Sequence, residues 1–150
     1  MAKFFYSMQN ILELKLKMED QAKNDYAVVQ AQLDEEMVKL EAIFHKKSEY
    51  ENKLKGQVSN RLIIVDIMQC SHAIKTLEYK IEEQKKAVTN AQRRVDLAKA
   101  KMQEAMIERK TQEKLKENAF ELFKRELIEV ENKENDELVS FKYNKSGKGV

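Results

Sequence analysis

The chain has 150 residues, of which 36% are charged, and it contains three glycines and no proline. Its 28 basic and 26 acidic residues leave a net charge of +2, which does not favour long-range attraction to nucleic acid. A single cysteine, Cys70, excludes an internal disulfide, and no apolar run is long enough to span a membrane. Since no secretory signal is recognised either, we expect a soluble, intracellular protein.

The first third of the chain carries an apolar stripe with steps of three and four residues. This spacing predicts a helix from about residue 4 to 55. One extra residue near Met37 interrupts the seven-residue repeat, which predicts a local unwinding of a coiled coil. The stripe consists of Ala22, Tyr26, Val29, Leu33, Met37, Leu40, Phe44 and Leu54, with Lys47 and Glu51 in register.

A turn is predicted at about residues 56–60. Gly56 is the only glycine in the interior of the sequence and can take the left-handed conformation that ends many helices. Ser59 or Asn60 can then cap the next helix. Two helices therefore meet at a short connection.

The second helix is predicted from about residue 61 to 143, followed by a disordered tail at 144–150. Gln84 is the one polar residue in its heptad stripe. Continuing the stripe past Ala105 would place Arg109, Gln112 and Lys116 on the seam, so we expect the heptad repeat to fail there. The stripe runs through Ile63, Ile67, Cys70, Ile74, Leu77, Ile81, Gln84, Val88, Ala91, Val95, Ala98, Met102 and Ala105.

The two stripes predict one antiparallel register. If the turn is centred near residue 58, facing positions have numbers that add to about 117, because both helices rise by about 1.5 Å per residue. Leu40 then meets Leu77, Leu33 meets Gln84 and Tyr26 meets Ala91. The predicted fold is all-α: a single domain, residues 1–150, that forms a long two-helix coiled-coil hairpin with a C-terminal helical overhang.

Both ends of the sequence are rich in large apolar residues. The overhang from Ala119 to Phe141 has no segment of its own chain to face, and the first twelve residues are similarly apolar. A helix exposed on all sides does not need such residues, each worth about 1.5–3 kcal/mol when buried. We therefore expect these ends to bind another protein.

At its two ends the chain resembles the FliJ family, the coiled-coil component of the bacterial flagellar type III export apparatus. The N-terminal resemblance covers residues 3–15 (KFFYSMQNILELK), followed by Glu19, Lys23 and Tyr26. The C-terminal resemblance covers residues 113–117 (EKLKE), Phe123, Glu126, Glu131, residues 136–138 (DEL) and Tyr143. The middle third is similar to the family only as coiled coil.

The resemblance implies a rotary-stalk-like protein that inserts into the hexameric export ATPase and promotes its assembly or activity. It also implies contacts with the export gate protein and export chaperones at the cytoplasmic face of the inner membrane. The predicted contacts with the ATPase ring are Phe4, Phe5, Met8, Phe120, Phe123, Leu127 and Val130. The predicted gate contacts are Met37, Glu41, Phe44, Ser48, Ile67, Ser71, Ile74 and Glu78.

No catalytic, cofactor-binding or metal-binding site is predicted, and we expect no enzyme activity. His45 and His72 would lie near each other in the predicted register and could bind a metal with Glu41 or Glu49, but solvated surface histidines explain the same pattern. The alternative functions are a generic coiled-coil adaptor, or a basic hairpin that binds nucleic acid or an anionic membrane through the cluster Lys85, Lys86, Arg93, Arg94, Lys99 and Lys101.

Overall fold

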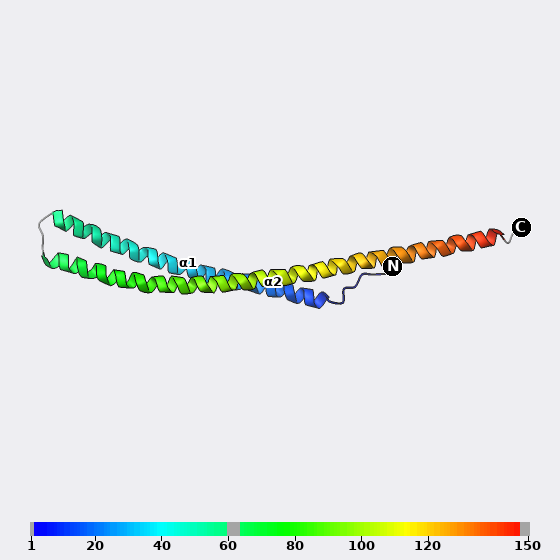
Figure 1. The fold of residues 1–150 in the computed structure, drawn as a ribbon, viewed down its shortest axis with the longest axis horizontal. Coiled ribbons are helices and arrows are strands. Elements are labelled where there is room, and N and C mark those ends of the chain that lie inside the picture. The colour runs from blue at the N-terminus through cyan, green and yellow to red at the C-terminus, as the bar shows by residue number, and fades with distance from the viewer. Residues whose placement is uncertain (1, 60–63, 148–150) are drawn as a thin grey trace. The chain divides into compact units, whose positions relative to one another are not determined.

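Two long helices make up the protein. The computed structural model describes residues 2–59 and 64–147, in which α1 spans Gln9–Ser59 and α2 spans Ile64–Gly147 (Figure 1). The chain forms two compact units. We call residues 20–104 the hairpin unit, and residues 1–19 with 105–150 the terminal unit. The predicted all-α helical hairpin is confirmed.

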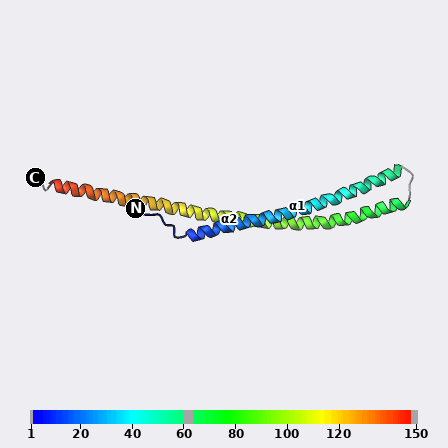
Figure 2. The same ribbon diagram turned by 180° about the vertical axis from the view of Figure 1, so that it is seen from behind.

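In the hairpin unit, α1 and α2 run side by side, as both views of the ribbon show (Figures 1 and 2). Its core contains Leu33, Ala91 and Val95, against which Tyr26, Val29 and Val88 pack. Leu33 is 4% exposed and Ala91 fully buried. Burial of a side chain such as Leu33 contributes about 1.5–3 kcal/mol. Cys70, Leu77 and Ile81 are also buried, so the predicted stripe of α2 does form its inner face.

The predicted interruption of the repeat in α1 is wrong. Met37 and Phe44 are exposed, at 52% and 43%, while Glu36 and Ile43 are the half-buried residues. With this exchange, the inner positions of α1 follow an unbroken heptad spacing. They are Leu12, Lys15, Glu19, Ala22, Tyr26, Val29, Leu33, Glu36, Leu40, Ile43, Lys47, Tyr50 and Leu54, none of which is exposed.

A polar pair explains why the apolar pattern misled at this point. The side-chain amide of Gln84 donates hydrogen bonds to the backbone carbonyl oxygen of Glu36, at 2.9 Å, and to its Oε2 atom, at 2.6 Å. The hydrogen bond from Gln84 lowers the pKa of the Glu36 carboxyl below its ordinary value. Because a polar residue on one helix meets a polar residue on the other, neither needs an apolar neighbour.

Leu33 lies in the cluster with Ala91 and Val95, whereas Gln84, its predicted partner, donates to Glu36, about one turn further along α1. A second contact points the same way, because Lys47 Nζ lies 3.6 Å from Glu78 Oε1. In both contacts, the residue of α2 lies further along the chain than the partner predicted from a sum of 117. Tyr26 and Ala91 still share one cluster, as do Val29 and Val88.

The position of the helix ends accounts for this shift. Gly56 does not end the first helix, because α1 continues through it to Ser59, and no described glycine has a positive φ. α2 begins at Ile64, so the midpoint between the two helix ends falls later than residue 58. The predicted cap at Asn60 and the predicted start of the second helix at 61 lie outside the described residues.

The outer ends of the helices differ from prediction as well. α1 begins at Gln9 and not near residue 4, with the Gln9 amide donating to the Tyr6 carbonyl oxygen at 3.1 Å. The preceding residues instead bring Phe4 back against α2. α2 continues to Gly147 rather than ending at 143. Lys145 in the last turn suits the negative end of the helix dipole.

In the terminal unit the heptad of α2 does not fail, contrary to prediction. Arg109, Gln112 and Lys116 all lie half-buried on the seam, followed by Ala119 and Phe123. They are accommodated because α1 offers polar partners there. Lys15 Nζ lies 3.0 Å from Glu108 Oε2, Arg109 forms an ion pair with the buried Glu19, and Lys116 donates to Gln9 Oε1 at 2.7 Å.

Candidate functional site

Three aromatic rings meet in the terminal unit. The Phe4 ring lies 5.0 Å from that of Phe120, edge to face, and 5.4 Å from that of Phe123, measured between centroids. Phe120 and Phe123 stack at 6.5 Å, one turn apart on α2. The Lys124 ammonium lies 4.9 Å from the Phe120 ring centre. Three predicted ring-contact residues, distant in sequence, are thus brought together.

A groove of about 440 Å³ lies beside this aromatic cluster, where the segment before α1 crosses α2. Its walls are apolar apart from Tyr6, Ser7 and Glu126. Tyr6 is 8% exposed, and its hydroxyl has no hydrogen-bond partner among the described residues. A buried hydroxyl without a partner is uncommon in folded proteins, so this end of the groove has an unused capacity for hydrogen bonding.

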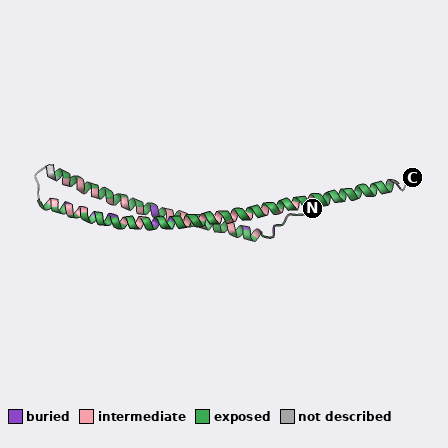
Figure 3. Cartoon of the chain, in the orientation of Figure 1, coloured by how far each residue is buried: buried purple, intermediate pink, exposed green. Residues whose placement is uncertain are grey.

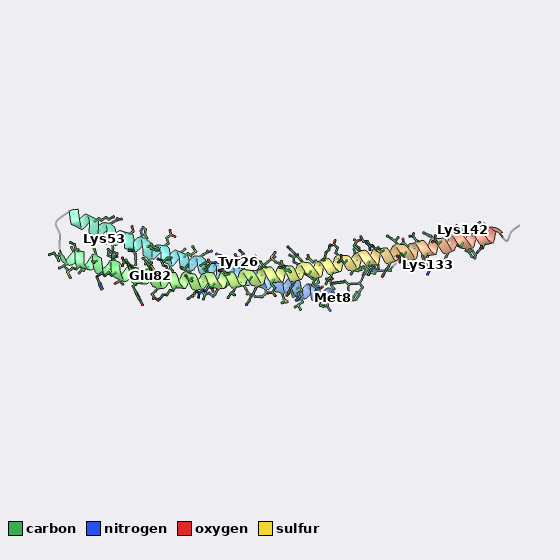
Figure 4. All side chains as sticks on the ribbon, in the orientation of Figure 1. Met8, Tyr26, Lys53, Glu82, Lys133 and Lys142 are labelled. Carbon is green, nitrogen blue, oxygen red and sulfur yellow. The ribbon has the colours of Figure 1, made fainter. Side chains whose placement is uncertain are left out.

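The other predicted ring contacts border the groove or follow it along α2. Phe5 is 85% exposed, Met8 37% and Val130 54%, while Leu127 is half-buried. Phe5 and Met8 line the groove with Phe123. Leu127 and Val130 lie one and two turns beyond Phe123 on the same side of α2, since steps of four and three residues return to one helix face. Side chains stand out all along this part of α2 (Figure 4, near Lys133).

Sequence reasoning missed six further residues that line the groove. They are Tyr6, Ser7, Leu115, Ala119, Leu122 and Glu126. Tyr6 escaped notice because the first residues were expected to be helical, which would not have folded it onto α2. Ala119 carried a usable signal, because a small residue at a seam position lets another segment approach the helix closely.

The predicted gate contacts all lie in the hairpin unit, but they differ in accessibility. On α1 the four residues Met37, Glu41, Phe44 and Ser48 are exposed and fall on one side of the helix. On α2 the residues Ile67, Ser71 and Ile74 are half-buried, and Glu78 is exposed. The Lys85 ammonium lies 5.9 Å from the Phe44 ring centre. The α1 residues are therefore the more accessible half of this set.

The two histidines are exposed, and His45 Nδ1 lies 3.4 Å from Glu49 Oε1 on its own helix. Within residues 2–59 and 64–147, no group of three His, Cys, Asp or Glu side chains is placed to hold a metal ion. In the same part of the chain, neither helix has a stretch apolar enough to cross a bilayer.

In the basic cluster of α2, Lys85 and Lys86 form ion pairs with Glu82 and Glu83, at 3.5 and 3.2 Å. These carboxylates neutralise part of the positive charge that a nucleic acid or an anionic membrane would meet. The structure therefore adds no support for binding to either surface.

Comparison with known proteins gives one match that covers almost the whole chain. A family model described as "Flagellar FliJ protein" matches residues 4–148. No curated protein and no solved structure matches the chain. The matched range includes the aromatic cluster, the groove and the exposed part of α2.

Proposed function

The chain belongs to the FliJ family and is a component of the flagellar type III protein export apparatus, and we propose that it inserts there into the hexameric export ATPase like the stalk of a rotary motor. The inserted part is the terminal unit. Hydrolysis takes place in the ATPase, and the protein contributes binding surface without chemistry of its own.

The observation that carries the proposal is the accessible apolar surface of the terminal unit. Phe5 and Val130 remain more than half exposed although they flank the aromatic cluster. Apolar groups of this size contribute about 1.5–3 kcal/mol each when a partner covers them. A ring of ATPase subunits provides such a cover from several sides, so one helix end can hold neighbouring subunits together and promote assembly or turnover.

The hairpin unit provides the second set of contacts. We propose that the exposed α1 residues Met37, Glu41, Phe44 and Ser48 contact the cytoplasmic domain of the export gate, with Glu78 of α2 beside them. Export chaperones bind this protein as well. These contacts place the protein at the cytoplasmic face of the inner membrane, linked to the ATPase by one unit and to the gate by the other.

ATP turnover by the export ATPase of the same organism, titrated with this protein, tests the stalk role. We expect saturable stimulation by the unmodified chain. The variant with Leu127→Ala and Val130→Ala loses most of it, because two apolar groups of the proposed contact are truncated. The matched control carries Ile128→Ala and Val139→Ala, which removes similar side chains from the opposite side of α2, where both are exposed.

Circular dichroism of both variants should show unchanged helix content, because none of the four side chains belongs to the buried core. Equal stimulation by the test and control variants would show that the wrong face has been assigned. Absence of both stimulation and co-migration with the ATPase would remove the stalk role itself.

A further inference from the structure

The far part of α2 presents an apolar face with no neighbour among the described residues of the terminal unit. Every residue from 128 to 145 is exposed (Figure 3). Leu127, Val130, Leu138 and Phe141 nevertheless fall on one side of the helix. The last three are each more than half exposed, and the ATPase contacts proposed above extend only to Val130. The face therefore continues for three turns beyond any surface assigned so far.

The charges around this face are strongly one-sided. Between residues 126 and 141 there are six acidic residues and one basic residue, a net charge of −5, whereas the whole chain carries +2. Glu131 and Glu134 share the side of Leu127 and Leu138, and Glu137 borders it. Glu134, Glu137, Leu138 and Phe141 line a shallow hollow of about 490 Å³. No ion pair of Glu131, Glu134 or Glu137 is found in the described part of the chain.

The apolar side chains and the negative charge together determine which kind of partner can bind this face. Nucleic acid and anionic membranes are excluded as partners of this face, because like charges repel. A second copy of the same segment is disfavoured for the same reason, since residues 127–141 carry a net charge of −4. The basic stretch of α2 at residues 85–101 has the opposite charge, but its outward side offers Leu97 as its one large apolar side chain.

We propose that the face of α2 from Leu127 to Phe141 binds a partner helix with an apolar stripe flanked by lysine or arginine side chains. The apolar stripe covers Val130, Leu138 and Phe141, and the cations pair with Glu131, Glu134 and Glu137.

The acidic face adds the chemistry of the partner surface to the proposed function. It rests on the proposed function only for the identity of the protein that carries this partner surface. If the export ATPase is the partner, the part of its ring that meets residues 131–141 is basic. The face itself can be tested without the ATPase, so the two proposals can fail separately.

The test uses two labelled synthetic helices of three heptads with the same leucine seam, one flanked by lysines and the other by glutamates. Fluorescence anisotropy measures their binding to the full chain. We expect the lysine helix to bind at least about tenfold more tightly than the glutamate helix, and to weaken about tenfold as sodium chloride rises from about 0.05 to about 0.5 M. Equal affinity of the two helices would overturn the proposal.

Two pairs of variants separate a specific face from general attraction. Replacing Glu131, Glu134 and Glu137 by Gln should weaken the binding of the lysine helix to the protein about tenfold. The control replaces Glu82 and Glu83 by Gln and Asp96 by Asn, which changes net charge equally elsewhere on α2. Leu138→Ala should weaken binding, and Val139→Ala, at a neighbouring exposed position on another side, should not. Equal effects within either pair would contradict the proposed face.

The binding of the lysine helix is measured independently of ATPase stimulation. Specific binding of the lysine helix by a protein that does not stimulate the ATPase would remove the stalk role and support the acidic docking face. Stimulation of the ATPase that is unchanged by the three Gln substitutions, together with no preference for the lysine helix, would remove the docking face and leave the stalk role standing.

Discussion

The hairpin unit and the terminal unit share one heptad geometry but differ in the proportion of polar side chains on their seams. In the hairpin unit the seam is filled by Leu33, Ala91 and Val95. In the terminal unit, Leu12 and Phe123 share the seam with a larger number of polar side chains, among them the ion pair of Glu19 with Arg109. An apolar seam gains free energy in proportion to the area that it buries, whereas a buried ion pair such as Glu19 with Arg109 must first offset the cost of removing both charges from water. The contrast indicates a stable hairpin and a terminal unit whose helices separate more easily.

The largest expected effect is in the hairpin core. Leu33→Ala removes a side chain that is 4% exposed and leaves a cavity, so the free energy of unfolding should fall by about 2–4 kcal/mol. Val38→Ala is the control, because Val38 lies five residues further along the same helix and is 64% exposed. Urea titration followed by circular dichroism measures both. A similar loss in the two variants would contradict the assigned seam.

The ion pair of the terminal unit provides the next test. Among the described residues, Glu19→Ala leaves the half-buried Arg109 with one ion pair, to Glu113 on its own helix at 2.9 Å. Amide hydrogen exchange in residues 9–19 should accelerate by about tenfold, while exchange in the hairpin core is unchanged. Glu13→Ala, at an exposed position of the same helix, serves as the control.

Replacing both partners should restore protection in the terminal unit. In the variant with Glu19→Leu and Arg109→Leu, an apolar pair of similar size occupies the same seam position and leaves no charge unpaired. Protection that is equal to or better than that of the unmodified chain is expected. Continued rapid exchange would mean that the ion pair is not what joins these helices.

A smaller effect of opposite sign is expected at Gly56. This residue lies inside α1, and a Cβ atom built on it meets no other atom within 4 Å. Gly56→Ala should therefore raise the free energy of unfolding by about 0.5–1 kcal/mol, because alanine loses less backbone entropy in a helix. Thermal unfolding followed by circular dichroism gives the comparison. A loss of stability would favour the left-handed turn predicted at this position from sequence.

The smallest effect concerns the pH dependence of the hairpin unit. The hydrogen bond from Gln84 lowers the pKa of Glu36, so this contact stabilises the fold above the ordinary pKa of a glutamate. Its contribution is lost as the pH falls through the lowered pKa. Glu36→Gln should reduce the difference in melting temperature between neutral pH and pH of about 3. Glu35→Gln, at the exposed neighbouring position, is the control and should leave that difference unchanged.

Much of the fold follows from residue spacing. The heptad of α2 from Ile67 to Ala105 is visible in the sequence and is observed without a shift. The inner face of α1 differs from prediction at Met37 and Phe44, because the residue one position earlier lies on the seam in both places. The seam position belongs to Glu36 and Ile43, and the partner for Glu36 is a glutamine on the other helix. Spacing within one helix carries no information about such a partner.

The aromatic members of the candidate site were predictable as residues, whereas their arrangement was not. The apolar character of Phe4, Phe120 and Phe123 is plain in the sequence, but their contact requires that the first residues leave the helix and cross α2. The groove and the buried Tyr6 hydroxyl follow from this crossing. Sequence reasoning that extended α1 to residue 4 had no reason to expect either.

Helix type and the inner face of α2 are local properties, because they depend on backbone propensity and on steps of three and four residues. The amino-acid sequence is enough to find them in this protein. The register between α1 and α2 is different, since it depends on where one helix ends and the next begins, and Gly56 did not end α1. The burial of Glu19 and Arg109 is likewise a tertiary outcome, because a charged residue takes a seam position only when a partner on the other helix pairs with it.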